Sequence, residues 1–488
     1  MSSPTHRPQP GAQQGAPDCT IVLDSSDSAK SLATLAAPDA AAAAAKARGL
    51  PAAADVAPPA PAAAPRGRAY YVDWLRAALT ALVVVHHCVC TYLSSSPWGQ
   101  AAKKKDDPAL WLLTQLFVNG NQAYFMTIFM FVSGLYTPGS YTRKGPGKFL
   151  ADRSLRLLLP CLCYSLLAPP LINWWNDLAK AAPGVTPSLG AAFANWLKPG
   201  WPTTYVLPTG PPWFIWMLWC FDAVYVVTRA ARESSLGRAI SRRARALAGG
   251  DPAASALPRR AAPPTGGQYT TREMLSCGAA LTAVMFVLCY TVRMVDALIF
   301  GLRPMTFVSR GPFVSFMPDY FVVYIVAFAL GTHSGPGRWD VLNRLPSGWA
   351  GWCLAAGGVW WTLLGWVPNI VLHPAMAMQR GDGAFLLSWF LRTFVEQSFC
   401  VVWSIGLIVL FRDAFNARPG KWGSQIIGAA YAVYIVHPLI IMLYARALMP
   451  ITFTSFVINA AAISAPVTIT SWLVGAGLKN IPGAHRVL

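Results

Sequence analysis

The segment DWLRAALTALVVVHHCVCTYL, residues 73–93, decides the fold class of this chain. Most of its residues are apolar. At 1.5 Å per helical residue, a helix of this length crosses a hydrocarbon core of about 30 Å. Further apolar runs recur along the chain, at about residues 111–136, 156–175, 212–229, 275–299, 318–333, 349–371, 385–411, 425–445 and 451–475. The sequence therefore predicts an all-α fold, a polytopic integral membrane helical bundle of about ten transmembrane helices.

The composition favours the same class. Of the 488 residues, 55% are hydrophobic and only 12% are charged, whereas an ordinary soluble domain carries roughly twice that charged fraction. The net charge of +19 comes from basic residues between the apolar runs, without a stripe of exposed aromatic residues. This pattern predicts the lipid bilayer as a partner and no nucleic acid. The ten cysteines lie mostly within apolar runs and form no CxxC pair, so we expect neither disulfides nor a metal site.

Two segments differ from the apolar runs in composition. Residues 1–67 are rich in Ala and Pro, and we expect a disordered N-terminal tail before a membrane domain over residues 68–488. Residues 230–273 form the longest polar connection. We interpret it as a flexible basic cytosolic loop, with a patch for anionic lipid as the alternative. Lys and Arg are more frequent in this loop and in the loops on its side, which predicts a cytosolic location for both termini. Which membrane the chain occupies stays open.

Ionisable side chains within the apolar runs are candidates for a functional site. Such a group is costly in hydrocarbon unless it faces the interior of the bundle, a cavity or a partner. The rule selects Asp73, Arg76, His86, His87, Asp222, Arg293, Asp296, Glu396 and His437.

Arg76 and His87 lie in the first apolar run, eleven residues apart. At about 100° per residue they project from the same face of a helix, separated by about 16 Å along its axis. His86 points about 100° away and is the weaker candidate. The alternative for His87 is a structural role, in which a neighbouring backbone carbonyl satisfies the imidazole.

Two further motifs combine side chains at helical spacing. Arg153 and Arg156 stand directly before the third run, and two arginines three residues apart can fork around a phosphate. Their alternative role is to anchor the topology at the membrane edge. In the ninth run, Tyr434 and His437 also lie three residues apart. There a phenol can orient an imidazole, and hydrogen bonding between helices is the alternative.

Together these motifs resemble the acyltransferase 3 family of membrane acyltransferases, and within it the glucan-modifying (OpgC/MdoC-like) branch, over roughly residues 68–475. In that family, Arg or Lys, ten intervening residues and His lie in the first span, as Arg76 and His87 do here. The runs FMTIFMFVSG (125–134), KFLADRSLR (148–156) and GPPWFIW (210–216) resemble its Ser-Gly helix, its RxxR pair and the start of its fourth span. The chain departs from the branch that has a Trp-Ser-Leu-x-x-Glu run in that span.

The resemblance implies that a short acyl group, such as acetyl or succinyl, moves from acyl-CoA to a hydroxyl of a carbohydrate, lipid or other acceptor. His87 would be the general base, with an acylated His87 as a second route. Arg76 would steer the donor or stabilise developing negative charge, and His437 would belong to the same catalytic site. Arg153 and Arg156 would hold the CoA phosphates. Acyl-CoA would be a co-substrate, with no permanently bound cofactor and no metal.

Two other functions stay open at this point. A proton-coupled or anion transporter also carries His, Glu and Arg within the membrane. However, no pair of Gly- or Pro-interrupted spans recurs at corresponding positions in two halves of the chain. The second alternative is a non-catalytic bundle that resembles a sterol or lipid receptor. The acyl group, the acceptor and the oligomeric state are left undetermined.

Overall fold

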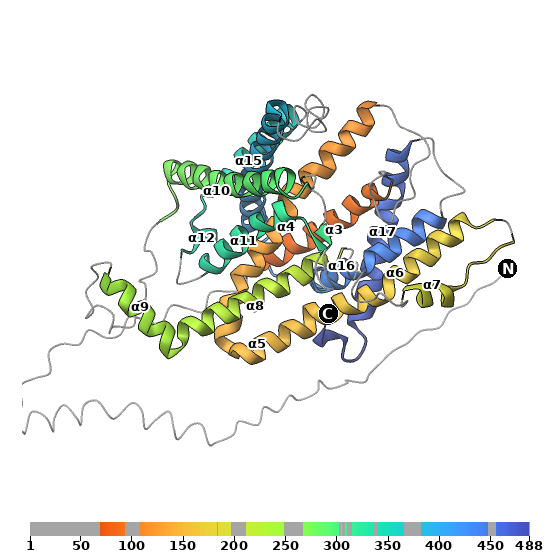
Figure 1. Cartoon of the computed structure of the whole chain (residues 1–488), viewed down its shortest axis with the longest axis horizontal. Coiled ribbons are helices and arrows are strands. Elements are labelled where there is room, and N and C mark those ends of the chain that lie inside the picture. Colours follow the sequence, from red (N-terminus) through yellow and green to blue (C-terminus); the bar gives the residue numbers. More distant parts are fainter. Residues whose placement is uncertain are drawn as a thin grey trace, which may run out of the picture. The chain divides into compact units, whose positions relative to one another are not determined.

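A computed structural model of the chain describes residues 69–92, 108–182, 184–196, 211–247, 267–301, 304, 308–309, 315–335, 339–365, 382–447 and 455–487. The N-terminal tail expected over residues 1–67 lies outside these ranges. Figure 1 shows the helical domain that the described residues form. Its first half contains α3 (Tyr70–Tyr92), α4 (Pro108–Lys144), α5 (Pro146–Arg153), the π-helix η1 (Ser154–Leu158), α6 (Leu159–Lys180), α7 (Leu189–Trp196), α8 (Trp213–Glu233) and α9 (Ser235–Leu247).

The second half of the domain is helical apart from one short hairpin. Its helices are α10 (Thr271–Leu298), α11 (Pro318–His333), α12 (Val341–Arg344), α13 (Trp349–Leu364), α15 (Gly383–Ala414), α16 (Lys421–Ala447), α17 (Phe456–Lys479) and the 3₁₀-helix η5 (Ala484–Arg486). The strands β1 (Val308–Ser309) and β2 (Ser315–Phe316) pair antiparallel, with Val308 opposite Phe316.

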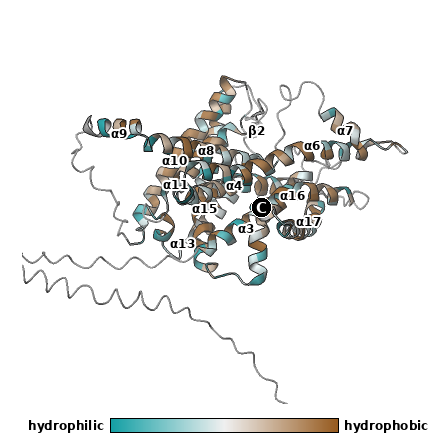
Figure 2. Ribbon diagram, turned by 90° about the horizontal axis from the view of Figure 1, so that it is seen from below, coloured by the Kyte–Doolittle hydropathy of each residue, from teal (hydrophilic) through white to brown (hydrophobic). Residues whose placement is uncertain are grey.

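Each apolar run of the sequence coincides with a helix, which confirms the all-α, multi-pass membrane fold. Seven of the described helical segments are long and apolar enough to cross a membrane, and these are α3, Pro146–Leu178, α8, α10, α15, α16 and Val457–Lys479. Figure 2 shows how hydrophobic residues dominate the ribbons of the bundle. Helices α11 and α13 have 16 residues each, whereas a span needs about 20. The number of ten crossings therefore stays a prediction.

Helices α4 and α11 lie side by side and approach closely through two glycines. A Cβ atom at Gly134 would lie 2.2 Å from the carbonyl oxygen of Phe328, and one at Gly331 would lie 2.1 Å from that of Phe131. Neither position has room for a side chain, and small residues allow this close packing of membrane helices. The Ser-Gly step at residues 133–134 thus has a structural reason.

The core surrounds α16 and the helices that pack on it. One buried cluster joins apolar residues of α3, α4, α8, α11 and α15 with Tyr434 of α16. A second cluster joins α3, α16 and α17. The edge-to-face contact between Phe214 and Tyr434, with ring centroids 6.1 Å apart, connects the start of α8 to α16. Helix α16 is therefore packed on several sides, which fixes the side chains along its length.

Part of the connection over residues 230–273 is helical in the structure. Helix α8 continues to Glu233, α9 follows after one residue, and α10 begins at Thr271. The composition predicted a flexible loop over residues 230–273, and the structure describes residues 235–247 of it as a helix. Residues 248–266 lie outside the described ranges, and the flexible loop expected there stays a prediction.

Candidate functional site

The structure brings His87 of α3 and His437 of α16 into contact. The Nδ1 atom of His87 lies 2.8 Å from Nε2 of His437. The two rings are nearly parallel, with an interplanar angle of 14° and centroids 5.0 Å apart. His437 is fully buried, and His87 is half-buried. Two residues that the sequence analysis selected in different spans therefore lie in one site.

The hydrogen bonds around this pair fix the neutral tautomers of both rings. His437 Nδ1 lies 2.8 Å from the carbonyl oxygen of Tyr434 and 3.3 Å from that of Val433. A carbonyl oxygen only accepts, so Nδ1 of His437 carries the proton and its Nε2 accepts. His87 must then donate through Nδ1, which leaves the lone pair of His87 on Nε2. This is the arrangement in which one imidazole orients another for proton transfer.

Two tyrosines on α16 connect this helix to the segments beside the pair. The Tyr434 hydroxyl donates to the carbonyl oxygen of Pro211, just before α8. The Tyr431 hydroxyl donates to the carbonyl oxygen of Arg156, within η1. Tyr431, Tyr434 and His437 follow one another at intervals of three residues, so neighbouring members lie close together on α16. They connect this helix to η1, to the start of α8 and to α3.

The RxxR pair lies at the start of a short π-helix, with Arg153 as the last residue of α5 and Arg156 within η1. The backbone N–H of Leu159 donates to the carbonyl oxygen of Ser154, an i to i−5 hydrogen bond. Such wide turns are rare and occur frequently at functional sites. Each residue of a wider turn advances by a smaller angle, so residues three apart no longer lie one above the other. Arg153 and Arg156 accordingly have different surroundings.

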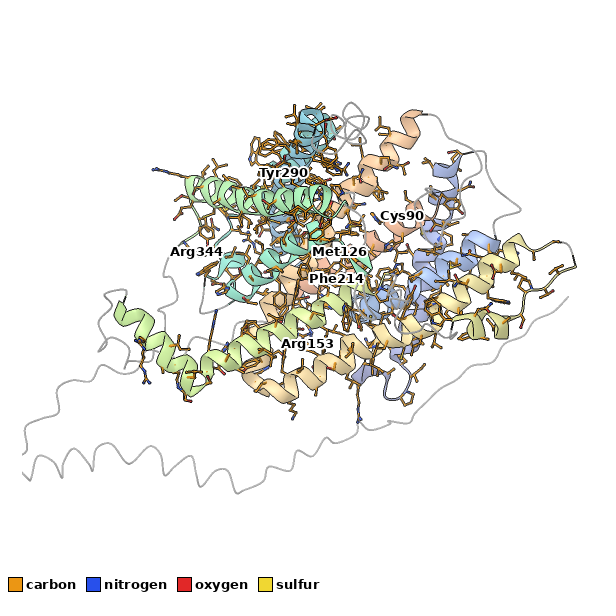
Figure 3. All side chains as sticks on the ribbon, in the orientation of Figure 1. Cys90, Met126, Arg153, Phe214, Tyr290 and Arg344 are labelled. Carbon is orange, nitrogen blue, oxygen red and sulfur yellow. The ribbon has the colours of Figure 1, made fainter. Side chains whose placement is uncertain are left out.

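Arg153 forms an ion pair with a buried acid. Its Nε atom lies 3.1 Å from Oδ2 of Asp222, whose side chain is fully buried. Thr137 donates to the other carboxylate oxygen at 2.8 Å. The guanidinium also lies over the Phe149 ring, 5.2 Å from its centroid. Figure 3 labels Arg153 at the end of α5. This arginine therefore links α5 to α4 and α8.

Arg156 and Arg76 are the more accessible basic residues of the site. The side chain of Arg156 is 49% exposed, with Nε 3.5 Å from Asp152. Arg76 is 47% exposed and lies 4.0 Å from Asp73. Arg156 lies next to Tyr431, because its carbonyl oxygen accepts the hydrogen bond from the Tyr431 hydroxyl. Arg76 lies on the same face of α3 as His87, and His87 contacts α16.

His86 has a different environment from its neighbour. Its side chain is 4% exposed, and its ring lies 5.1 Å from the Phe125 ring of α4. It therefore packs between α3 and α4, whereas His87 faces α16.

A buried ion network joins α10, α11 and α15. Arg293 contacts Asp319 at 2.9 Å and Glu396 at 2.7 Å. It also donates to Thr393 at 2.8 Å. Arg392 pairs with the other oxygen of Glu396 at 2.8 Å. Two cations thus balance two anions, and these helices do not include α3 or α16. We interpret the network as a structural connection between three helices.

The rule for ionisable side chains within apolar runs identified Arg293 and Glu396 as candidates, whereas Asp319 and Arg392 were not predicted. Asp319 is the second residue of α11, at the edge of an apolar run, where an acid needs no explanation. Arg392 precedes Glu396 by four residues on α15. That spacing is the signal that could have identified it.

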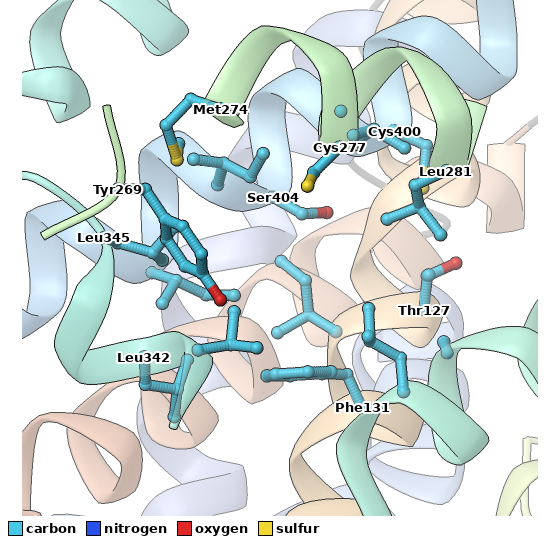
Figure 4. A pocket seen from close by; sticks show the side chains of 18 of the residues that line it. Thr127, Phe131, Tyr269, Met274, Cys277, Leu281, Leu342, Leu345, Cys400 and Ser404 are labelled. Atoms are coloured by element: carbon cyan, nitrogen blue, oxygen red, sulfur yellow. The ribbon is translucent and has the colours of Figure 1, made fainter. Parts of the chain in front are cut away.

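Two cavities of the bundle lie away from the histidine pair. The first, of about 270 Å³, lies between α4, α10, α11 and α15 and has a largely apolar lining (Figure 4). Thr127 and Phe131 line it from α4, whereas His86 packs on Phe125, about 200° around the helix from Thr127. The second is a groove of about 750 Å³ between α3, α4 and α17, lined by Val85 and Val89. Both valines lie on the side of α3 opposite His87.

The described residues contain no group of three or more His, Cys, Asp or Glu side chains that could hold a metal ion. The chemistry available in the site is that of imidazole, phenol and guanidinium groups. A family model described as an acyltransferase domain matches residues 69–476. No curated protein and no solved structure matches the chain.

Proposed function

Because the chain belongs to the acyltransferase 3 family and is a membrane acyltransferase, we propose that it transfers a short acyl group from acyl-CoA to a hydroxyl group, with His87 as the general base. The observation that carries the proposal is the contact between His87 and His437. It gives His87 a partner for Nδ1–H and leaves a basic nitrogen at Nε2. A neutral imidazole suits proton abstraction near neutral pH.

The reaction follows from this arrangement. Nε2 of His87 takes the proton of the acceptor hydroxyl while the oxygen attacks the carbonyl carbon of the thioester. The carbon–sulfur bond then breaks, and the CoA thiolate receives the proton from the imidazolium of His87. His437 accepts the hydrogen bond from Nδ1 throughout, and its own Nδ1–H stays with the carbonyl of Tyr434. His437 is therefore a positioning residue that keeps the His87 ring in one tautomer and one orientation.

The exposed arginines suit the donor. Arg156 and Arg76 keep about half of their side-chain surface accessible. Guanidinium groups form bidentate hydrogen bonds with phosphates, so we assign both to the CoA phosphates. Arg153 is less available because it compensates the charge of Asp222. We assign it the role of holding η1, and thereby Arg156, in place.

The experiment uses the purified chain in detergent with acetyl-CoA and succinyl-CoA. Donor binding is measured by calorimetry, and transfer is followed by release of the free CoA thiol when carbohydrate or lipid alcohols are added. We expect binding that weakens in Arg156→Glu and turnover that is lost in His87→Ala. A folded wild-type protein that neither binds nor consumes any acyl-CoA would contradict the proposed donor. Turnover that survives in His87→Ala would contradict the proposed base.

A further inference from the structure

Helix α9 turns away from the end of α8 at a well-defined corner. Ser234 is extended between the two helices, and its hydroxyl accepts a hydrogen bond from the N–H of Gly237 at 3.1 Å. This is the contact of an N-cap residue. A Cβ atom at Gly237 would lie 2.0 Å from the carbonyl oxygen of Ala231, so only glycine allows the close approach. Because α8 is long and apolar enough to span the membrane, this corner places α9 beside the membrane surface.

The residues of α9 divide into two faces. Leu236 and Ile240 lie about 40° apart around the helix, as do Arg238 and Arg242, and the two pairs are about 200° apart. Arg243 lies about 20° around the helix from Leu236, on the apolar side, from where its long side chain can reach toward the polar side. The sequence of α9, SLGRAISRRARAL, contains four arginines and no acidic residue. A short helix of this kind is typical of segments that lie in the membrane interface.

The apolar face is uncovered. Leu236 is 68% exposed and Ile240 is 59% exposed. Helix α9 packs against α8, and Figure 1 shows it at the far end of that helix. Figure 2 shows both hydrophilic and hydrophobic residues along its ribbon. Two large aliphatic side chains beside a membrane span have lipid chains as their available apolar environment.

The charge of the other face selects the lipid. Glu233, two residues before α9, already pairs with Arg229 at 2.6 Å and accepts a hydrogen bond from Tyr141. With four arginines and no acid within α9, this helix complements an external negative charge. Anionic phospholipids of the cytosolic leaflet attract basic residues close to the membrane. Nucleic acid would satisfy the arginines but would leave Leu236 and Ile240 in water.

We propose that α9 lies in the plane of the membrane and binds anionic phospholipid, with Leu236 and Ile240 among the acyl chains and the arginines at the head groups. This inference does not depend on the acyl donor or on the acceptor. It concerns a surface that is separate from the histidine pair.

Hydrogen exchange of the full chain in lipid nanodiscs tests this inference. Backbone amides of α9 are compared in phosphatidylcholine alone and in phosphatidylcholine with added phosphatidylserine. We expect exchange to slow by about tenfold or more with phosphatidylserine, because each arginine near an anionic surface contributes to binding. High salt should reverse this change, since it screens exposed charges.

Three variants separate the contributions. The triple variant Arg238→Glu, Arg242→Glu, Arg243→Glu should lose the dependence on phosphatidylserine. The matched control Arg272→Glu, at an exposed arginine of α10, should keep it. The double variant Leu236→Ser, Ile240→Ser should exchange faster in both lipids. If Leu236→Ser, Ile240→Ser exchanges like the wild type in both lipids, the apolar face does not lie among acyl chains, which would overturn the proposal. A wild-type helix insensitive to phosphatidylserine would overturn it as well.

Discussion

The Nδ1 atom of His87 donates to the Nε2 atom of His437 across 2.8 Å, and the other end of His437 donates to a backbone carbonyl of its own helix. Nothing in this chain of hydrogen bonds involves a carboxylate. The pair therefore orients the base without adding a negative charge to the membrane interior, where an unpaired charge would be costly.

His87→Ala should lower turnover by about two to four orders of magnitude, as removal of a general base does, while the protein stays folded. The measurement is the rate of CoA thiol release at saturating donor. His86→Ala is the matched control, because His86 packs on Phe125 and faces away from His437. Equal losses in both variants would indicate that His87 has a structural role.

His437→Ala should lower kcat by roughly one to two orders of magnitude, with little change in KM for acyl-CoA. The variant leaves Nδ1–H of His87 without its acceptor, so the ring is free to change its tautomer and orientation. His437→Gln should keep more activity, because its side-chain carbonyl oxygen can accept the same hydrogen bond. A purely structural role predicts that both variants lose activity in proportion to their loss of stability, which thermal unfolding would reveal.

Arg156→Glu should raise the KM for acyl-CoA more than it lowers kcat. Phosphate contacts remote from the reacting carbonyl bind the ground state and the transition state alike. The side chain is half-exposed, so the protein should remain folded. Steady-state kinetics with varied acyl-CoA measure both constants. An unchanged donor affinity would leave Arg156 as a topology anchor.

Arg153→Ala should lower the stability of the protein instead of its affinity for the donor. It leaves the carboxylate of Asp222 buried without its cation, and such a loss costs about 3–5 kcal/mol in the free energy of unfolding. The double variant Arg153→Ala, Asp222→Ala should recover part of this loss. Denaturant unfolding in mixed micelles measures both. If Arg153→Ala unfolds like the wild type and only donor affinity falls, Arg153 contacts the donor directly.

The fold class could be predicted from the sequence because membrane spans depend on length and hydropathy, which are local properties. The sequence also identified His87 and His437 as candidates, since an ionisable group in a span needs an explanation. The resemblance to the family implied that the two histidines share a site, but spacing alone did not predict their contact. Spacing within a helix shows which face a residue occupies, but the helix that packs on that face is set by contacts between segments 350 residues apart.

The different surroundings of Arg153 and Arg156 could not be predicted for another reason. The expectation that both hold phosphate stays a prediction, but it assumed α-helical spacing, and Arg156 lies in the π-helix η1. Asp222 was known to be an intramembrane acid, but its partner lies 69 residues earlier in the chain. The amphipathic pattern of α9 was not predicted, because its high arginine content made the spacing of four residues between Leu236 and Ile240 hard to recognise.

Gly134→Ala should destabilise the bundle by about 1–3 kcal/mol, as overpacking does. The added Cβ atom would meet the Phe328 carbonyl, so α4 and α11 would have to separate. Gly139→Ala on the same helix is the matched control, because its Cβ atom would have only an ordinary contact, 3.7 Å from Arg143. That variant should be neutral or more stable, since alanine favours helix by up to about 1 kcal/mol. Similar unfolding of both variants would contradict the close contact.

Arg293→Met should strongly destabilise the protein. The side chain is fully buried and pairs with both Asp319 and Glu396, so its removal deprives both carboxylates of this cation, while Arg392 still pairs with Glu396. Breaking a buried pair in this way costs about 3–5 kcal/mol. Adding Asp319→Asn removes one of the stranded charges and should recover part of the loss. The comparison is made by denaturant unfolding, with acyl transfer measured on the double variant. If the network only connects α10, α11 and α15, the double variant keeps the activity expected from its folded fraction. Loss of activity in a fully folded double variant would assign these charges a direct part in the reaction or in the movement of an ion.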